Sequence, residues 1–221
     1  WLSDHKFQPE LATRDQLTAF FRDHPEKAVN HEDALDDIGE YAGFVTRQQD
    51  VYHTPVIGPS GIGKTQLLPT VVSFLTELSD DIDTKLIDGT DLGKKADDGF
   101  LLDEFAHGLA ELETPIVCID DCGLDKRIEH SLNELRAAVD SGLFVTTWTP
   151  ERWGVNRGRV QDALPPSNEI HLDAFPRKDT DETLRIIFEL LSENEFTLPS
   201  ETLDRIHELS EGIPRLIHTL A

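Results

Sequence analysis

Eight consecutive residues constrain the fold of this chain more than any other stretch. They match the pattern G-x-x-x-x-G-K-[ST] at every required position and are Gly58, Pro59, Ser60, Gly61, Ile62, Gly63, Lys64 and Thr65. An apolar segment, residues 54–57, precedes them, and a helix-like run, residues 66–75, follows. The sequence therefore predicts a strand, a tight loop and a helix in succession, which is the context that this pattern requires.

The residue types of this loop suit the binding of phosphate. Glycines let the backbone turn so that successive N–H groups point inward, and the following helix adds the partial positive charge of its N-terminus. We expect Lys64 to reach the β- and γ-phosphates of a nucleotide and the Thr65 hydroxyl to bind Mg²⁺. The residues expected to bind the nucleotide are Gly58, Pro59, Ser60, Gly61, Ile62, Gly63, Lys64, Thr65 and Gln66. The alternative is a glycine-rich turn whose lysine is only solvated. Such a turn would not require every position of the pattern to match, nor a strand-like segment before it and a helix-like segment after it.

Length and composition set the size and the compartment that we expect. A chain of 221 residues can hold one α/β core with a small appendage. The chain begins at Trp1 and contains no Met, from which we expect a fragment or a processed form. No run is long and apolar enough to span a membrane and no signal-peptide pattern opens the chain, so we expect a soluble, cytoplasmic protein with no membrane partner.

The charge of the chain is strongly negative. Asp and Glu number 43 against 20 Lys and Arg, which gives a net charge of −23, yet the hydrophobic fraction of 38% is sufficient for a core. Such a surface is typical of proteins from salt-accumulating archaea, where concentrated cations screen the repulsion between carboxylates; an ordinary acidic protein is the alternative. A chain of this charge lacks the broad basic surface of a nucleic-acid binder, so any contact with DNA has to come from a local patch or from a region outside this chain.

Apolar periodicity indicates alternating helices and strands. Residues 15–22 and 31–52 have apolar positions at helical spacing, residues 84–88 are typical of a strand, and residues 100–112 are again typical of a helix. The glycine- and aspartate-rich stretch 89–99 is expected to be a loop. This alternation predicts a parallel sheet that is covered on both faces.

A second informative stretch, residues 115–121, is an apolar run that ends in Asp120 and Asp121. In a parallel sheet these carboxylates lie at the edge where the phosphate-binding loop also begins. We expect Asp120 to hold Mg²⁺, directly or through water, and Asp121 to polarise an attacking water. Because Asp commonly ends strands, a structural role is the alternative.

Residues 142–149 predict the strand next to the one that ends at Asp120. The end of this strand could place Thr147 or Thr149 near the γ-phosphate, although threonine is common in strands for structural reasons.

The two cysteines, Cys118 and Cys122, have no further Cys or paired His nearby. We expect them to be reduced and structural, without zinc.

Two arginines are candidates for contact with the γ-phosphate. Arg159 precedes the last expected core strand, near residues 169–172, and could act as a finger on a neighbouring subunit or as an ordinary ion-pair partner. After helix-like runs at 179–191 and 200–209, Gly212 and Pro214 suit the end of one helix and the start of the next. Arg215 at the start of that third helix could reach the γ-phosphate from a small helical lid.

Taken together, these motifs resemble those of the AAA+ ATPases over roughly residues 50–221. Within that family they are most similar to the branch of archaeal replication initiators of the origin-recognition type and related transposon or plasmid ATPases. The resemblance implies that Lys64 and Thr65 bind phosphate and Mg²⁺ and that Asp120 is the metal carboxylate. It also implies that Asp121 takes the place of the usual catalytic Glu, Arg159 that of the finger and Arg215 that of the lid sensor.

Two departures from the family pattern affect the expected activity. Asp121 is one methylene shorter than Glu, so hydrolysis could be slow, and Trp148 falls where the family often has a sensor Asn.

The overall prediction is an α/β P-loop NTPase with a parallel, Rossmann-like three-layer sheet followed by a small helical lid. We expect a helical segment at 1–52, an ATPase core at 53–175 and the lid at 176–221. The ligands are ATP or ADP with Mg²⁺, and the nucleotide state is expected to control self-association or a protein partner, with DNA bound through a region outside this chain. The alternatives are a slowly hydrolysing signalling NTPase switch and a nucleotide-binding scaffold without turnover.

Overall fold

A computed structural model describes residues 29, 31–79, 82–122, 127–191 and 198–220. Five parallel strands form one sheet, in the order β2-β3-β4-β1-β5. The strands are β1 (Val51–Ile57), β2 (Asp83–Asp88), β3 (Pro115–Asp120), β4 (Gly142–Trp148) and β5 (Ile170–His171). The predicted α/β fold with a parallel sheet is confirmed, and β3 and β4 are neighbours as expected. The helix predicted at 15–22 lies outside the described residues.

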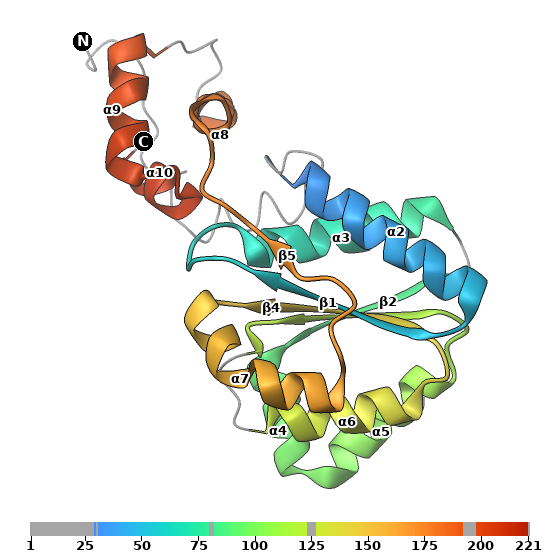
Figure 1. Ribbon diagram of the computed structural model, residues 1–221. Coiled ribbons are helices and arrows are strands. Elements are labelled where there is room, and N and C mark those ends of the chain that lie inside the picture. The colour runs from blue at the N-terminus through green and yellow to red at the C-terminus, as the bar shows by residue number, and fades with distance from the viewer. Residues whose placement is uncertain (1–28, 30, 80–81, 123–126, 192–197, 221) are drawn as a thin grey trace.

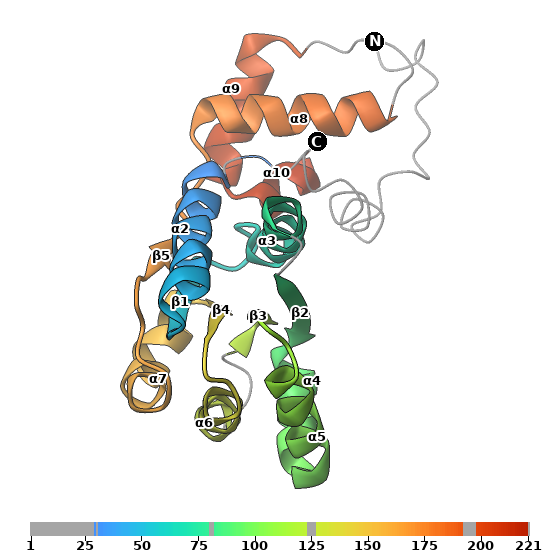
Figure 2. The same cartoon turned by 90° about the vertical axis from the view of Figure 1, so that its right-hand side faces the viewer.

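Helices cover both faces of the sheet (Figure 1). On one face lie α2 (Glu32–Gln48) and α3 (Lys64–Leu78). The other face carries α4 (Gly89–Asp97), α5 (Gly99–Ala110), α6 (Ile128–Ala138) and α7 (Pro150–Ala163). The C-terminal helices α8 (Arg177–Leu191), α9 (Ser200–Ser210) and α10 (Pro214–Leu220) form a separate group beyond one end of the sheet, above α2 and α3 (Figure 2). Among the described residues, no helix is long and apolar enough to cross a membrane.

The core consists of two apolar clusters separated by the sheet, because successive side chains of a strand point to opposite faces. Along β3, Ile116 and Cys118 pack with α2 and α3, whereas Val117 and Ile119 pack with α4 to α7. All of β4 is buried, which agrees with a central parallel strand. Cys118 and Cys122 are free and buried, as expected for structural cysteines.

Two expectations for secondary structure were wrong. The helix expected over 31–52 ends at Gln48, because Gln49 adopts a left-handed conformation with φ of 52° and β1 then begins at Val51. The loop expected over 89–99 contains α4. The Asp88 side chain accepts a hydrogen bond from the backbone N–H of Thr90 at 2.7 Å and caps this helix, whose apolar face is buried.

The stretch before the last strand is a helix that the sequence analysis did not predict. Residues 150–163 form α7, which begins with the Thr149 side chain accepting from the Arg152 backbone N–H at 3.4 Å, and Pro150 occupies the first turn. Both features favour a helix start. Arg159 therefore lies on a helix that covers the sheet.

A fully buried polar network joins β1, β4 and the end of α7. Trp148 donates its Nε1–H to Thr146 Oγ1 at 2.8 Å, and Thr146 Oγ1 lies 2.8 Å from His53 Nε2. His53 Nδ1 lies 3.0 Å from the Leu164 carbonyl oxygen, which can only accept, so Nδ1 carries the proton. The Thr146 hydroxyl therefore donates to Nε2, and each of these polar groups has a partner.

We expect Thr146→Val to destabilise the fold by about 2–4 kcal/mol, because it leaves the Trp148 and His53 nitrogens buried without partners. Thr54→Val is the matched control. Thr54 is also buried on a central strand, but its hydroxyl has no partner among the described residues, so this change should be neutral or stabilising. Urea unfolding of both variants measures the difference. Equal losses in the two variants would contradict the role of the network.

The same network makes stability depend on pH. Burial lowers the pKa of His53 from 6.5 to about 4. Between about pH 6.5 and pH 4, His53 is protonated in the unfolded chain but neutral in the folded chain. The free energy of unfolding therefore falls as the pH falls through this range. Between pH 7.5 and 5.5 we expect His53 to account for a loss of about 1.4 kcal/mol. His53→Gln, measured by urea unfolding at both pH values, should show a correspondingly smaller loss; an unchanged loss would be inconsistent with this assignment.

Candidate functional site

The loop between β1 and α3 presents unpartnered N–H groups. Gly61 and Gly63 have φ of 87° and 108°, a left-handed conformation that glycine adopts without strain. Within the described part of the chain, the following backbone N–H groups have no hydrogen-bond acceptor: Ser60, Gly61, Gly63, Lys64 and Thr65. Together with the N-terminus of the 15-residue helix α3, they form a cradle suited to an anion.

Lys64 lies folded over this loop. Its Nζ donates to the carbonyl oxygens of Gly58 and Pro59 at 2.6 and 2.9 Å. Burial lowers the pKa of Lys64, while the charges of Asp120 and Asp121 act in the opposite direction. The ammonium group therefore lies against the start of the loop, and the charges of Asp120 and Asp121 are near enough to influence its pKa.

The Thr147 hydroxyl connects the ends of β3 and β4. It donates to Asp120 Oδ1 at 2.6 Å and accepts from the Asp121 backbone N–H at 2.8 Å, and that N–H also lies 3.0 Å from Asp120 Oδ1. Thr147 thus fixes one carboxylate oxygen of Asp120. Of the two threonines considered from the sequence, Thr147 lies beside the acidic residues, whereas Thr149 caps α7.

Strand alternation explains why Trp148 is not part of this site. Thr147 shares a face of β4 with Leu143 and Val145, which pack with the P-loop helix, whereas Trp148 belongs to the apolar cluster on the opposite face. The Trp148 side chain is fully buried there and stacks near Trp153, with ring centroids 5.3 Å apart. Trp148, which stands where the family often has a sensor Asn, is therefore part of the hydrophobic core.

Arg152 was not identified from the sequence. Its Nη1 lies 2.6 Å from Asp121 Oδ1, in an ion pair that leaves the Arg152 and Asp121 side chains 35% and 43% exposed. The only signal available in the sequence was the Thr149-Pro150 pair, which predicts a helix start and hence places Arg152 one turn from the edge of the sheet. Its contact with Asp121 follows from the side-by-side arrangement of β3 and β4.

His31 also contacts the loop and was not identified. It is buried next to Gly63, where a Cβ would lie 3.2 Å from His31 Nε2, and its Nδ1 has no partner among the described residues. Burial lowers the pKa of His31 to about 4, so the imidazole is neutral at pH 7. His31 precedes α2 and thereby joins this helix to the loop.

Helix α10 meets the loop through Arg215. The Arg215 backbone N–H donates to the Gly61 carbonyl oxygen at 3.2 Å, and a Cβ on Gly61 would lie 2.7 Å from Arg215 Cβ. The helices α8 to α10 pack around an apolar cluster that includes Phe175, Ile206 and Ile217, with Val29 packed against it. Residues before α2, the lid and the loop are therefore in one neighbourhood.

Arg159 is not brought to the loop. It is exposed on α7 and forms no hydrogen bond or ion pair with any other described residue, whereas nearby Arg157 pairs with Glu169 at 2.7 Å. Arg159 is exposed, so it is accessible to another subunit, and its role as a finger there stays a prediction.

The side chains at this site supply only some of the oxygen ligands that Mg²⁺ requires. The described residues contain no cluster of three or more His, Cys, Asp or Glu that could hold a metal by itself. Mg²⁺ is commonly bound by one or two carboxylates together with phosphate oxygens and water. The Asp120 carboxylate and the exposed Thr65 hydroxyl supply such a partial set.

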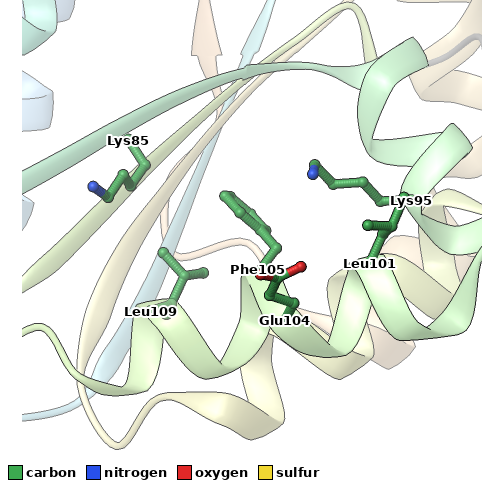
Figure 3. Close-up of a pocket in the computed structure, with 7 residues that line it drawn as sticks. Lys85, Lys95, Leu101, Glu104, Phe105 and Leu109 are labelled. Carbon is green, nitrogen blue, oxygen red and sulfur yellow. The ribbon is translucent and has the colours of Figure 1, made fainter.

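A separate hollow of about 380 Å³ lies at the β2 edge of the sheet. Figure 3 shows Phe105 between Lys85 and Lys95, and the Lys95 ammonium lies 5.7 Å from the centroid of the Phe105 ring. The hollow is lined by residues of β2, α4 and α5 and includes none of the loop or of the end of β3. It is distinct from the phosphate cradle.

The structure of this chain is similar to several solved protein structures. No protein-family model and no curated protein matches the sequence. The Holliday junction branch migration motor RuvB of Thermotoga maritima matches 86% of this chain at 18% identity, with a TM-score of 0.56. Domain III of the Thermotoga maritima replication initiation protein DnaA matches 88% of the chain at 17% identity, with a TM-score of 0.58. The ORC2 protein of Aeropyrum pernix, solved as ADPNP and ADP complexes, matches 86% at 15% identity, with a TM-score of 0.61.

The chain shares its fold with the RuvB, DnaA and ORC2 structures. At these identities the likeness is one of fold. The alignments cover 60% of the RuvB chain, 61% of the ORC2 chain and 83% of the DnaA domain, so this chain spans less than two thirds of RuvB and ORC2. Helices α8 to α10 lie within residues 176–221, the range in which the sequence analysis expects the lid.

We expect Gly212→Ala to disrupt the junction between the core and the lid. Gly212 has φ of 70°, and a Cβ there would lie 2.3 Å from the Phe175 carbonyl oxygen. The Phe175 N–H also donates to the Gly212 carbonyl oxygen at 2.7 Å, so the two backbones cannot separate without losing that bond. The expected loss is about 2 kcal/mol or more of unfolding free energy.

Gly154→Ala provides the control, because a Cβ at Gly154 meets nothing within 4 Å in the middle of α7. This change should be neutral or should stabilise by up to about 1 kcal/mol. Urea unfolding compares the two variants, and a Gly212→Ala protein as stable as Gly154→Ala would refute the steric argument.

Proposed function

We propose that this chain is an ATP-binding and ATP-hydrolysing module of the AAA+ family whose nucleotide state controls self-association or a partner. The observation that carries the proposal is the convergence of three groups at one edge of the sheet: the unpartnered N–H groups of the loop, the Lys64 ammonium and the Asp120 carboxylate held by Thr147. Each group complements a different part of a nucleoside triphosphate with its metal. The RuvB and ORC2 structures support the same assignment through their fold.

Each side chain has a defined role in this proposal. The loop N–H groups bind phosphate oxygens, and Lys64 exchanges the Gly58 and Pro59 carbonyls for the β- and γ-phosphates. Asp120 and Thr65 hold Mg²⁺, which when bound neutralises the charge that develops on the phosphates. Asp121 orients the attacking water and accepts its proton.

Arg215 and Arg159 extend the proposed site beyond the core. The Arg215 backbone is attached to the loop, so its side chain can reach the terminal phosphate from the lid. Exposed Arg159 acts on the nucleotide of a neighbouring subunit. DNA, if it is bound, contacts a region outside this chain, because the chain carries a net charge of −23.

A slow NTPase switch is the second candidate. The observation that favours it is the ion pair of Asp121 with Arg152, which occupies the carboxylate proposed to act as the base. A carboxylate oxygen that is bound to a guanidinium is not available to accept a proton from water until that contact is broken.

The test measures ATP binding by calorimetry and the ATPase rate against protein concentration in molar KCl. We expect Lys64→Ala to weaken ATP binding at least about tenfold, because a charge-assisted contact with phosphate is lost. Lys178→Ala is the control, since Lys178 is exposed on α8. Asp121→Asn should abolish turnover while ATP binding persists.

Mixing variants tests the assembly. Arg159→Ala and Lys64→Ala are each expected to be inactive alone, but a mixture should regain activity, because an Arg159 from one subunit can serve an intact loop on another. A rate that rises cooperatively with concentration would support assembly. Binding without turnover at any concentration would contradict the ATPase proposal and favour the scaffold, and turnover proportional to concentration would favour the switch.

A further inference from the structure

Arg152 and Asp121 face each other across the ends of two neighbouring strands. Asp121 follows β3 directly, and Arg152 lies in the first turn of α7, which follows β4. The pair is short, at 2.6 Å between Nη1 and Oδ1, but it is open to solvent on both sides. Ion pairs of this exposure contribute little to stability, so the pair can be exchanged at little cost.

The backbones on both sides of the pair are held in place. The Asp121 N–H is bound to Thr147 and Asp120, and Asp121 adopts φ of 51°, which turns the chain away from the strand. The Arg152 N–H is bound to Thr149, and its carbonyl oxygen accepts from Asn156 Nδ2 at 2.8 Å. Only the side-chain torsions of Arg152 and Asp121 can therefore change without breaking backbone contacts.

Arg152 is also close enough to the phosphate cradle to act on it. The first N–H of the loop, that of Gly58, donates to the Trp148 carbonyl oxygen at 3.1 Å, and Arg152 follows Trp148 by four residues. Its guanidinium is bound to Asp121, the neighbour of Asp120, and therefore lies at the edge of the sheet where the terminal phosphate is proposed to lie. Its planar donors can bind two oxygens of a phosphate at once.

We propose that Arg152 exchanges partners: it pairs with Asp121 when the terminal phosphate is absent and binds that phosphate when ATP is present, which releases the Asp121 carboxylate. This inference rests on the proposed function of the site. Phosphate carries more charge than a carboxylate and offers the guanidinium an equivalent pair of oxygens, so ATP can displace Asp121 whereas ADP cannot. The base is thereby freed only when there is a bond to hydrolyse.

The exchange predicts a specific pattern of affinities, measured by calorimetry with ADPNP and ADP in the presence of Mg²⁺. Arg152→Ala should weaken ADPNP binding about tenfold and change ADP binding less than twofold, because only the terminal phosphate loses a partner. Arg152→Lys should recover part of the loss. Asp121→Asn should tighten ADPNP binding about three- to tenfold, because Asp121 no longer competes for Arg152.

The double variant separates exchange from simple charge repulsion. If Asp121→Asn acted only by removing a negative charge near phosphate, its gain would persist in the Arg152→Ala background. The exchange predicts that the gain disappears there. Glu151→Gln is the matched control, since it removes a neighbouring charge that is not bound to Arg152; its effect should be small and the same in both backgrounds.

The outcomes for this inference and for the proposed function are distinct. If the natural protein binds ADPNP and Lys64→Ala does not, the nucleotide site is established, and an unchanged ratio of ADPNP to ADP affinity in Arg152→Ala overturns the exchange alone. Persistence of the Asp121→Asn gain in the double variant also overturns it. If the natural protein binds neither nucleotide, both the proposed function and the exchange fail.

Discussion

The candidate site depends on the hydrogen bonds of one hydroxyl group, that of Thr147. It joins the ends of two neighbouring strands by donating to the Asp120 carboxylate and accepting from the Asp121 N–H. The register of the sheet makes this possible, because pairing of Ile119 with Thr146 brings the next residue of each strand side by side. The position of both carboxylates relative to the P-loop therefore follows from strand pairing.

The same strand serves two purposes on its two faces. Thr147 faces α3 and the loop, whereas Thr146 and Trp148 face the opposite helices and form the buried network with His53. Parallel central strands are buried on both sides, so a polar side chain there is stabilised by a hydrogen-bond partner, as Thr146 and Thr147 both are. In β4 one polar residue orders the site and its neighbour orders the core that supports it.

The sequence was most informative where a motif prescribes backbone conformation. The left-handed glycines Gly61 and Gly63 and the following helix agree with the spacing of the pattern, and the acidic end of β3 could be placed beside it because parallel strands share an edge. These are local or topological requirements. They do not depend on the identity of the surrounding side chains.

The sequence was least informative where tertiary contacts decide. Helix α4 was assigned as a loop because its glycines and aspartates outweighed a short apolar face, and α7 was not recognised, so Arg152 could not be placed. The ion pair of Arg152 with Asp121 joins residues 31 positions apart, and no periodicity encodes it. Residue roles such as those of Arg159 and Arg215 remain predictions for the same reason.

The attachment of the lid to the loop has a mechanical consequence. The N–H at the start of α10 is bound to the carbonyl of Gly61, one of the residues whose own N–H is available to an anion. The N–H and the carbonyl of Gly61 belong to successive peptide groups that meet at one α-carbon, so a change in the Gly61 torsions when the cradle is filled also moves the acceptor of the Arg215 N–H. Helix α10 packs against α8 and α9, so its first turn is the point at which the loop is joined to all three C-terminal helices.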